Sequence, residues 1–290
     1  MCKKELARRW FLKGCRYDST GSERDKAIDA YRRSLKYDDE LTDAYVNLGF
    51  IYLAGTDYEK AAKCFQDVVG LEPKNPEAFN NLGYVYEEMK RLGCARQAYR
   101  QASGLDPKNV ETLLNLAKVY ELEGNYHDAV KQYKRAIKQD ADNIAPRFCL
   151  AVLYDNYDMF DEAMEEYQGV LDRDPDHIKG LLNMGNLYVQ LGNNERAIDL
   201  FKRVIALDPD NADACNQLGS VHKSDGNYAE ASASYKRVLS LDPFKEDAHM
   251  ELAEAQYLQY RSKFNGVKKE EVRQRIDYLL AINPDNGKGK

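Results

Sequence analysis

The chain repeats itself every 34 residues, and this period constrains its fold more than any other feature of the sequence. The prolines that keep this register are Pro73, Pro107, Pro175, Pro209 and Pro243, with Ala141 at the place between the second and the third. Glycines such as Gly49 and Gly83 show the same spacing. A fixed period of this length indicates an array of one small unit, in which each copy buries its apolar face against its neighbours.

Alignment on the period defines the individual copies. Six full copies begin at Thr42, Pro76, Val110, Ile144, Ile178 and Ala212. A variant copy begins near Ala7 with one extra residue in its turn, and a last copy begins at Glu246 with seven extra residues between its helices. We therefore expect a single array over residues 1–286. A short disordered tail is predicted over residues 287–290.

Each copy carries two stripes of apolar residues with helical spacing. In the copy at Thr42 the two stripes consist of Tyr45, Leu48, Gly49 and Tyr52, and then Ala61, Phe65 and Val68. This spacing places the residues of each stripe on one face of a helix. Pro73 closes the second helix, because proline cannot continue it. The pattern predicts an all-α fold of helix pairs.

The motif aromatic-x-x-Leu-Gly-x-x-Tyr, followed by alanine, an aromatic residue and proline, resembles the tetratricopeptide repeat (TPR) family. Local departures are Asp39 and Ala141 for proline, Arg147 for an aromatic residue, His222 for tyrosine, and Ala253 and Gln256 in the last copy. The resemblance implies a right-handed superhelical solenoid of about eight TPR helix pairs. It also implies that the first helix of each pair lines the concave side.

The second helix of the last copy has the pattern of a cap. Its apolar face consists of Val272, Ile276, Leu279 and Leu280, and its other face is rich in charged residues. A terminal repeat needs a polar outer side to remain soluble. We therefore predict a C-terminal capping helix.

Composition narrows the class of partner and the compartment. The net charge is −6, which argues against a nucleic-acid partner, since such proteins usually carry a basic surface. We find no apolar run approaching 18 residues, so no membrane insertion is expected. The N-terminus shows no apolar signal segment, and the six cysteines form no C-x-x-C pair. We therefore expect a cytoplasmic protein with reduced thiols.

A position number gives the place of a residue within its repeat, counted from the first residue of that repeat. Positions 2, 5, 6, 9, 12 and 13 face the groove, since position 6 lies about 200° around the helix from the buried position 8. Position 6 carries carboxamides in five copies, namely Asn47, Asn81, Asn115, Asn183 and Gln217. This column resembles the asparagine ladder in the repeat region of O-linked N-acetylglucosamine transferase. That resemblance implies contact with a peptide backbone; the alternative is hydrogen bonding locally or to water.

Other groove positions complete a candidate peptide-binding surface. They carry Phe50, Tyr84, Lys118, Phe148 and Asn186, and further apolar residues are Val46, Leu114, Val152, Leu182 and Val189. An apolar strip in a groove favours a ligand with apolar side chains. The alternative is that several of these residues pack against the neighbouring helix.

An acidic stripe runs beside the strip. Position 12 of three successive repeats carries Glu87, Glu121 and Asp155, and Glu77, Glu88 and Glu111 lie nearby. This stripe predicts a protein or peptide partner with Lys or Arg. The alternative is a solvated helix face. The lysine that chaperone-binding repeats use at position 5 is missing from every copy, so a chaperone C-terminus is not expected.

Catalytic and metal-binding patterns are missing. The histidines, His127, His177, His222 and His249, fall at unrelated positions of the repeat. We therefore expect no cofactor, no metal and no enzyme activity. The leading hypothesis is a non-catalytic scaffold that binds a peptide or protein segment in its groove. The alternatives are a self-associating assembly protein and the substrate-recruiting subunit of a separate enzyme.

Overall fold

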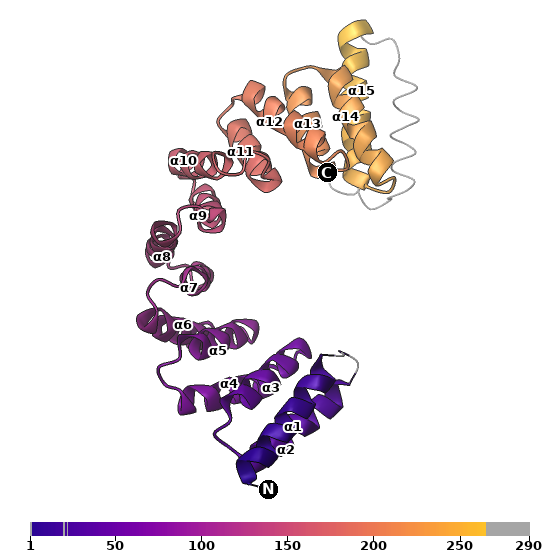
Figure 1. Ribbon diagram of the computed structural model, residues 1–290. Helices are drawn as coiled ribbons and strands as arrows, with labels where there is room; N and C mark the ends of the chain where they lie inside the picture. Colours follow the sequence, from indigo (N-terminus) through magenta and orange to yellow (C-terminus); the bar gives the residue numbers. More distant parts are fainter. Residues whose placement is uncertain (1, 20, 22, 265–290) are drawn as a thin grey trace. The chain divides into compact units, whose positions relative to one another are not determined.

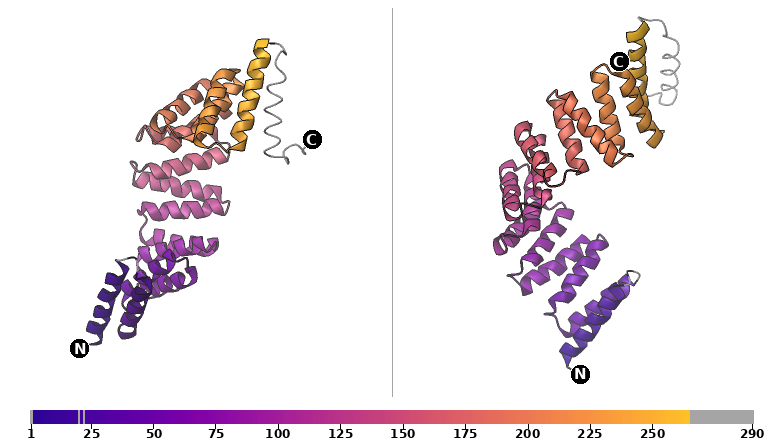
Figure 2. Two further views of the ribbon diagram at one scale, coloured as in Figure 1. Left: turned by 90° about the vertical axis from the view of Figure 1, so that its right-hand side faces the viewer. Right: turned by 45° about the horizontal axis from the view of Figure 1, so that its top comes forward.

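The computed structural model describes residues 2–19, 21 and 23–264. These residues form fifteen α-helices and no strand, which confirms the predicted all-α fold (Figures 1 and 2). None of these helices is both long enough and apolar enough to cross a bilayer. The predicted capping helix around Val272–Leu280 lies outside the described residues.

Helices that follow one another in the chain pack together, from α1 to α8 within residues 1–146 and from α10 to α15 within residues 147–290. Their bounds are α1 (Lys3–Asp18), α2 (Arg24–Tyr37), α3 (Thr42–Ala54), α4 (Tyr58–Leu71), α5 (Pro76–Glu88), α6 (Leu92–Leu105), α7 (Val110–Leu122), α8 (Tyr126–Gln139), α9 (Ile144–Asn156), α10 (Phe160–Leu171), α11 (Ile178–Gln190), α12 (Asn194–Leu207), α13 (Ala212–Ser224), α14 (Tyr228–Leu241) and α15 (Glu246–Phe264).

The chain divides into two compact units, residues 1–146 and 147–290. The first unit contains α1 to α8, and the second contains α10 to α15 together with most of α9. The single array over residues 1–286 stays a prediction, and the predicted tail over 287–290 lies outside the described residues.

Short polar signals start and end the helices. The Oδ1 atom of Asn109 accepts a hydrogen bond of 2.8 Å from the backbone N–H of Thr112, which caps the first turn of α7. Asn75, Asn125, Asn193 and Asn211 cap their helices in the same way. The turn inside each of the first seven repeats places position 15 at positive φ, whether the residue is Gly124 at +71° or Lys90 at +59°.

An aromatic ring at position 24 packs directly on a glycine at position 8 in most repeats. A Cβ atom added to Gly83 would lie 2.7 Å from Cδ1 of Tyr99, and one added to Gly185 would lie 2.6 Å from Cε1 of Phe201. Both rings are fully buried. The glycine therefore allows the two helices of a repeat to approach, and the ring fills the space between them.

The first repeat differs from the later ones at two core positions. Position 7 is buried in every later repeat, as Leu48, Leu82, Leu116, Leu150, Met184, Leu218 and Leu252. Position 10 is buried and apolar in the same repeats. In α1 these places carry Lys13 and Arg16, and both are exposed. Because burying an unpaired cation is costly, this face of α1 is suited to water and not to another helix pair.

Candidate functional site

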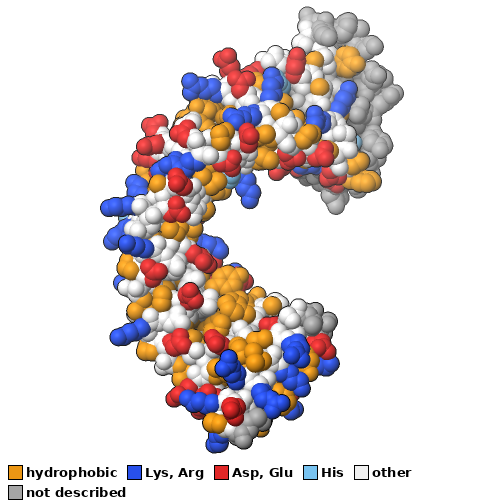
Figure 3. All heavy atoms as spheres, viewed as in Figure 1, with side chains coloured by type: hydrophobic (Ala, Val, Ile, Leu, Met, Phe, Trp, Pro, Cys, Tyr) orange, Lys and Arg blue, Asp and Glu red, His pale blue; other side chains and the backbone are white. Residues whose placement is uncertain are grey.

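The residues predicted to line the groove lie on the first helices of the repeats. In the first unit, α3, α5 and α7 each carry a half-buried asparagine at position 6 and an exposed side chain at position 9. Phe50 is 46% exposed and Tyr84 is 43% exposed. Figure 3 shows hydrophobic side chains gathered over α3 and α5. Positions 6 and 9 share one helix face, so each asparagine has the next exposed side chain as a neighbour.

In the second unit, α11 carries Asn183 and Asn186 at the same two positions, and α13 carries Gln217 at position 6. All three side chains are half-buried. Phe148 in α9 is also half-buried, with its ring centroid 6.2 Å from that of Tyr167 and 5.2 Å from that of His177. Part of the Phe148 ring is thus covered by neighbouring side chains.

The three carboxylates of the acidic stripe have partners inside the fold. The hydroxyl of Tyr99 donates to Oε2 of Glu87 over 3.2 Å, and Glu87 is only 4% exposed. The same contact joins Tyr133 to Glu121 at 3.0 Å. It joins Tyr167 to Asp155 at 3.4 Å. Position 12 therefore supplies the acceptor for a buried phenol at position 24 of its own repeat.

These contacts set the protonation of the groups involved. Burial, together with the nearby Glu87 carboxylate, raises the pKa of Tyr99, so the phenol stays protonated and donates. Nζ of Lys118 lies 2.6 Å from Oε1 of Glu87, and this hydrogen bond raises the pKa of Lys118. Burial raises the pKa of Asp155 as well. Lys118, a predicted groove residue, thus forms an ion pair with Glu87 of the acidic stripe.

Repeats with phenylalanine at position 24 lack the acid. Phe65 in the second repeat accompanies Leu53 at position 12, and Phe201 in the sixth repeat accompanies Val189. The seventh repeat has Lys223 at position 12, and there the phenol of Tyr235 donates to Glu251 of α15 over 3.0 Å. Each of these phenols thus has an acceptor, and the phenylalanine repeats need none.

Tyrosine hydroxyls at position 24 also form hydrogen bonds with two asparagines of the position-6 column. Nδ2 of Asn47 donates to the hydroxyl of Tyr31 over 3.0 Å. Asn183 is hydrogen-bonded to the hydroxyl of Tyr167. Each of these asparagines belongs to the repeat that follows its tyrosine. Their carboxamides are therefore partly used inside the fold.

The other carboxamides of the column differ. Nδ2 of Asn115 donates to Oδ1 of Asn80 over a long 3.4 Å. Asn81 and Gln217 make no side-chain hydrogen bond within the described part of the chain. Both follow a repeat whose position 24 is phenylalanine, Phe65 or Phe201. The ring before them has no hydroxyl to offer.

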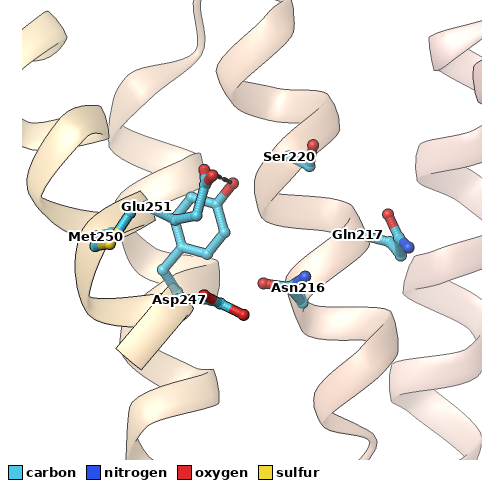
Figure 4. A pocket seen from close by; sticks show the side chains of 7 residues that line it. Asn216, Gln217, Ser220, Asp247, Met250 and Glu251 are labelled. Carbon is cyan, nitrogen blue, oxygen red and sulfur yellow. Dashed lines mark hydrogen bonds between the residues drawn. The ribbon is translucent and has the colours of Figure 1, made fainter. Parts of the chain in front are cut away.

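A pocket in the second unit lies between α13 and α15, with α14 beneath it (Figure 4). Its volume is about 290 Å³, and its lining consists of Asn216, Gln217, Ser220, Tyr235, Asp247, Met250 and Glu251. All of these except the floor residue Tyr235 occupy positions 2, 5, 6 or 9 of their repeats. Apart from Gln217, the sequence did not single these residues out, although their positions in the repeat were the available signal.

Side chains of the types that bind metal ions occur throughout the described residues 2–19, 21 and 23–264. No group of three or more His, Cys, Asp or Glu side chains is placed there to hold a metal ion. Burial raises the pKa of the Cys64 thiol to about 11, which keeps it protonated. Burial also lowers the pKa of His222, a side chain at the tyrosine position 11.

Paired helices, a repeated glycine–ring contact and an exposed first-helix face define an α-helical repeat protein of the solenoid class. Family models for the TPR repeat match residues 51–90 and 185–226. Models for the tetratricopeptide repeat match residues 86–147, 121–184 and 212–245. Together the matches run from residue 51 to residue 245. The chain belongs to the tetratricopeptide repeat family.

Solved structures with the same fold share little sequence with the chain. The C-terminal part of a TPR repeat-containing protein from Cytophaga hutchinsonii is 16% identical with a TM-score of 0.71, over 85% of this chain and 99% of that one. MamA is 22% identical with a TM-score of 0.54, over 60% and 95%. YrrB, a TPR protein with an unusual peptide-binding site, is 21% identical with a TM-score of 0.53, over 64% and 96%.

No curated protein sequence matches the chain. At identities this low the structural similarity establishes the fold alone. The family assignment adds the class of activity, because TPR arrays bind protein or peptide partners and are generally non-catalytic scaffolds. The chain is thus a protein–protein interaction scaffold.

Proposed function

We propose that each unit binds an extended peptide or protein segment of a partner on the groove-facing side of its first helices, with Asn81 bonding the backbone of the segment in the first unit and Gln217 in the second. The observation that carries this proposal is the division of the position-6 column. These two carboxamides have no partner within the described residues, while Asn47 and Asn183 bond tyrosines. A carboxamide offers both donors and an acceptor, which is what a peptide group requires.

The surroundings of Asn81 add apolar contact. Tyr84 lies one turn further along α5, and Phe50 occupies the corresponding place on α3, with its ring centroid 5.4 Å from that of Phe65. Burying these exposed rings under a ligand would gain free energy in proportion to the apolar area covered. YrrB, which shares this fold, has a peptide-binding site of its own.

We place the protein in the cytoplasm, because its six cysteines are free thiols.

End-to-end self-association through α1 is disfavoured. Stacking another repeat on this face would bury Lys13 and Arg16 at places where later repeats carry apolar side chains. Removing these two charges from water costs free energy unless the partner surface supplies carboxylates. Peptide binding in the groove needs no such compensation.

The experiment is a selection of random 12-residue peptides displayed on phage against the full chain, followed by affinity measurements with fluorescein-labelled binders. We expect Asn81→Ala to weaken binding of the peptides held by the first unit, and Gln217→Ala that of the peptides held by the second, by roughly three- to tenfold for one lost hydrogen bond. Asn47→Ala is the matched control, since its carboxamide is bonded to Tyr31, and should change the affinity little. Failure to select any peptide, or equal affinity in all three variants, would refute the proposal.

A further inference from the structure

We propose that the pocket between α13 and α15 receives a Lys or Arg side chain of the bound segment, an inference that rests on the proposed function. The pocket lies beside Gln217, one of the two carboxamides assigned above to the peptide backbone. A segment bonded to Gln217 would therefore place a neighbouring side chain at the pocket. The lining decides which side chain that is.

The charge of the lining is negative. Asp247 and Glu251 both line the pocket, and no lining residue is a cation. Nζ of Lys223 lies 2.6 Å from Oε2 of Glu251 and 2.7 Å from Oε2 of Glu254, so one cation already serves two carboxylates. Glu251 also accepts a hydrogen bond from the hydroxyl of Tyr235. The charge of Glu251 is thus largely compensated inside the fold.

Asp247 is the uncompensated group. It makes no ion pair and no side-chain hydrogen bond within the described residues. Figure 4 shows its carboxylate on α15 directed across the pocket toward Asn216 of α13. A ligand cation between these two helices would meet a carboxylate on one side and amide oxygens on the other. A carboxylate ligand would meet repulsion from Asp247 in the same place.

The remaining walls match the stem of a long basic side chain. Met250 is 50% exposed and presents a flexible apolar side chain, and the ring of Tyr235 forms the floor. Lys and Arg bury their methylene groups on such surfaces while the charged end stays among polar groups. Asn216, Gln217 and Ser220 supply acceptors for the N–H groups of that end. A purely apolar side chain would leave the carboxamides of Asn216 and Gln217 without partners.

The test uses the full chain and the same peptide display. We expect the binders selected on the wild type to be enriched in Lys or Arg at one position, and this enrichment to disappear on Asp247→Asn. For a selected peptide that responds to Gln217→Ala, Asp247→Asn should weaken binding by roughly three- to tenfold, the range of one partly exposed ion pair. The same peptide with Leu in place of its Lys or Arg should bind wild type and Asp247→Asn equally.

Asp43→Asn is the matched control. Asp43 also occupies position 2, in the first turn of α3, is exposed, and does not line the pocket. Because Asp43 belongs to the first unit, its substitution should leave the affinity of a peptide that responds to Gln217→Ala unchanged. Charge reversal by Asp247→Lys should favour a version of the peptide with Glu at the basic position. Asp247 lies on the surface of the first turn of α15, so we expect the helical circular dichroism of its variants to match the wild type.

The outcomes separate the two proposals. Peptides that respond to Gln217→Ala but not to Asp247→Asn would refute the basic pocket and leave peptide binding intact. Equal effects of Asp43→Asn and Asp247→Asn would also refute it, since they would show only a general effect of net charge. If no peptide is selected at all, the proposed function itself fails.

Discussion

The third and sixth repeats fill the space between their two helices with different aromatic rings. In both, an aromatic ring at position 24 lies against a glycine at position 8, as Tyr99 on Gly83 in one and Phe201 on Gly185 in the other. They differ in one hydroxyl group. In the third repeat, the hydroxyl of Tyr99 donates to the buried Glu87 at position 12, whereas the sixth repeat has Val189 at position 12. A buried phenol requires an acceptor, and the acid at position 12 follows from it.

The difference reaches the groove. Where position 24 is tyrosine, its hydroxyl can bond the carboxamide of the next repeat, as Tyr31 bonds Asn47. Where it is phenylalanine, the next carboxamide has no such partner, as for Asn81 and Gln217. For these carboxamides, the ring of the preceding repeat thus decides whether a partner inside the fold is present, whereas Asn115 bonds Asn80 and not Tyr99. Four predictions test this comparison.

The largest effect is expected where the two repeats are alike. Gly83→Leu and Gly185→Leu should each destabilise the protein by about 3 kcal/mol or more, since the new side chain would overlap a buried ring. Gly104→Ala is the control in α6, because a Cβ atom there meets nothing within 4 Å. It should stabilise by about 0.5–1 kcal/mol through helix propensity. Urea unfolding followed by circular dichroism measures all three; a harmless Gly83→Leu would contradict the packing.

The next effect separates the repeats. Glu87→Leu should cost about 2 kcal/mol, because it leaves the buried hydroxyl of Tyr99 without an acceptor and Lys118 without its pair. In the double variant with Tyr99→Phe, which reproduces the chemistry of the sixth repeat, most of this cost should be recovered. A double-mutant cycle by urea unfolding measures the coupling. Additive costs of the two substitutions would show that the hydroxyl and the carboxylate act independently.

The converse substitution converts the sixth repeat into the third. Phe201→Tyr should cost about 1–2 kcal/mol, because Val189 cannot accept a hydrogen bond. Adding Val189→Glu should restore part of that loss. Thermal unfolding of the two variants beside wild type provides the measurement. If Phe201→Tyr alone leaves the midpoint unchanged, the requirement for a position-12 acceptor is wrong.

The smallest effect is a pH dependence. Burial raises the pKa of Tyr99 above its value in the unfolded chain, so its contribution to stability is complete below about pH 10 and is lost as the pH rises further. Between pH 9 and 11 the wild type should therefore lose about 1 kcal/mol more stability than Tyr99→Phe. Urea unfolding at a series of pH values measures the two slopes. Parallel slopes would mean that the phenol titrates equally in both states.

The candidate site could be predicted only in part. The position of Asn81 and Gln217 on the groove-facing side follows from the 34-residue register, because a side chain's direction on a helix depends on its spacing from buried neighbours. Their lack of partners does not follow from it. That property depends on the ring of the preceding repeat, 16 residues earlier in the chain and in contact only after two helix pairs have stacked.

The carboxylates at position 12 show the same limit. Their spacing predicts an acidic stripe, and the structure shows Glu87 buried with Tyr99 and Lys118 around it. Sequence reasoning treats each helix as a cylinder with one buried face, whereas the second helix of a repeat covers part of the other face as well. Lys118 comes from a different repeat, so no local pattern indicates this pair.

By itself the sequence determined the family, the helix pairs and the positions that can carry a ligand, because each of these depends on short-range periodicity that every copy repeats. Only the tertiary structure decided which of those positions are available. Hydrogen-bond partners such as Tyr31 for Asn47, or Lys223 and Tyr235 for Glu251, come from neighbouring repeats, and their contacts exist only once the helices pack. The pocket beside Gln217 has the same origin, since α13 supplies one wall and α15 the other.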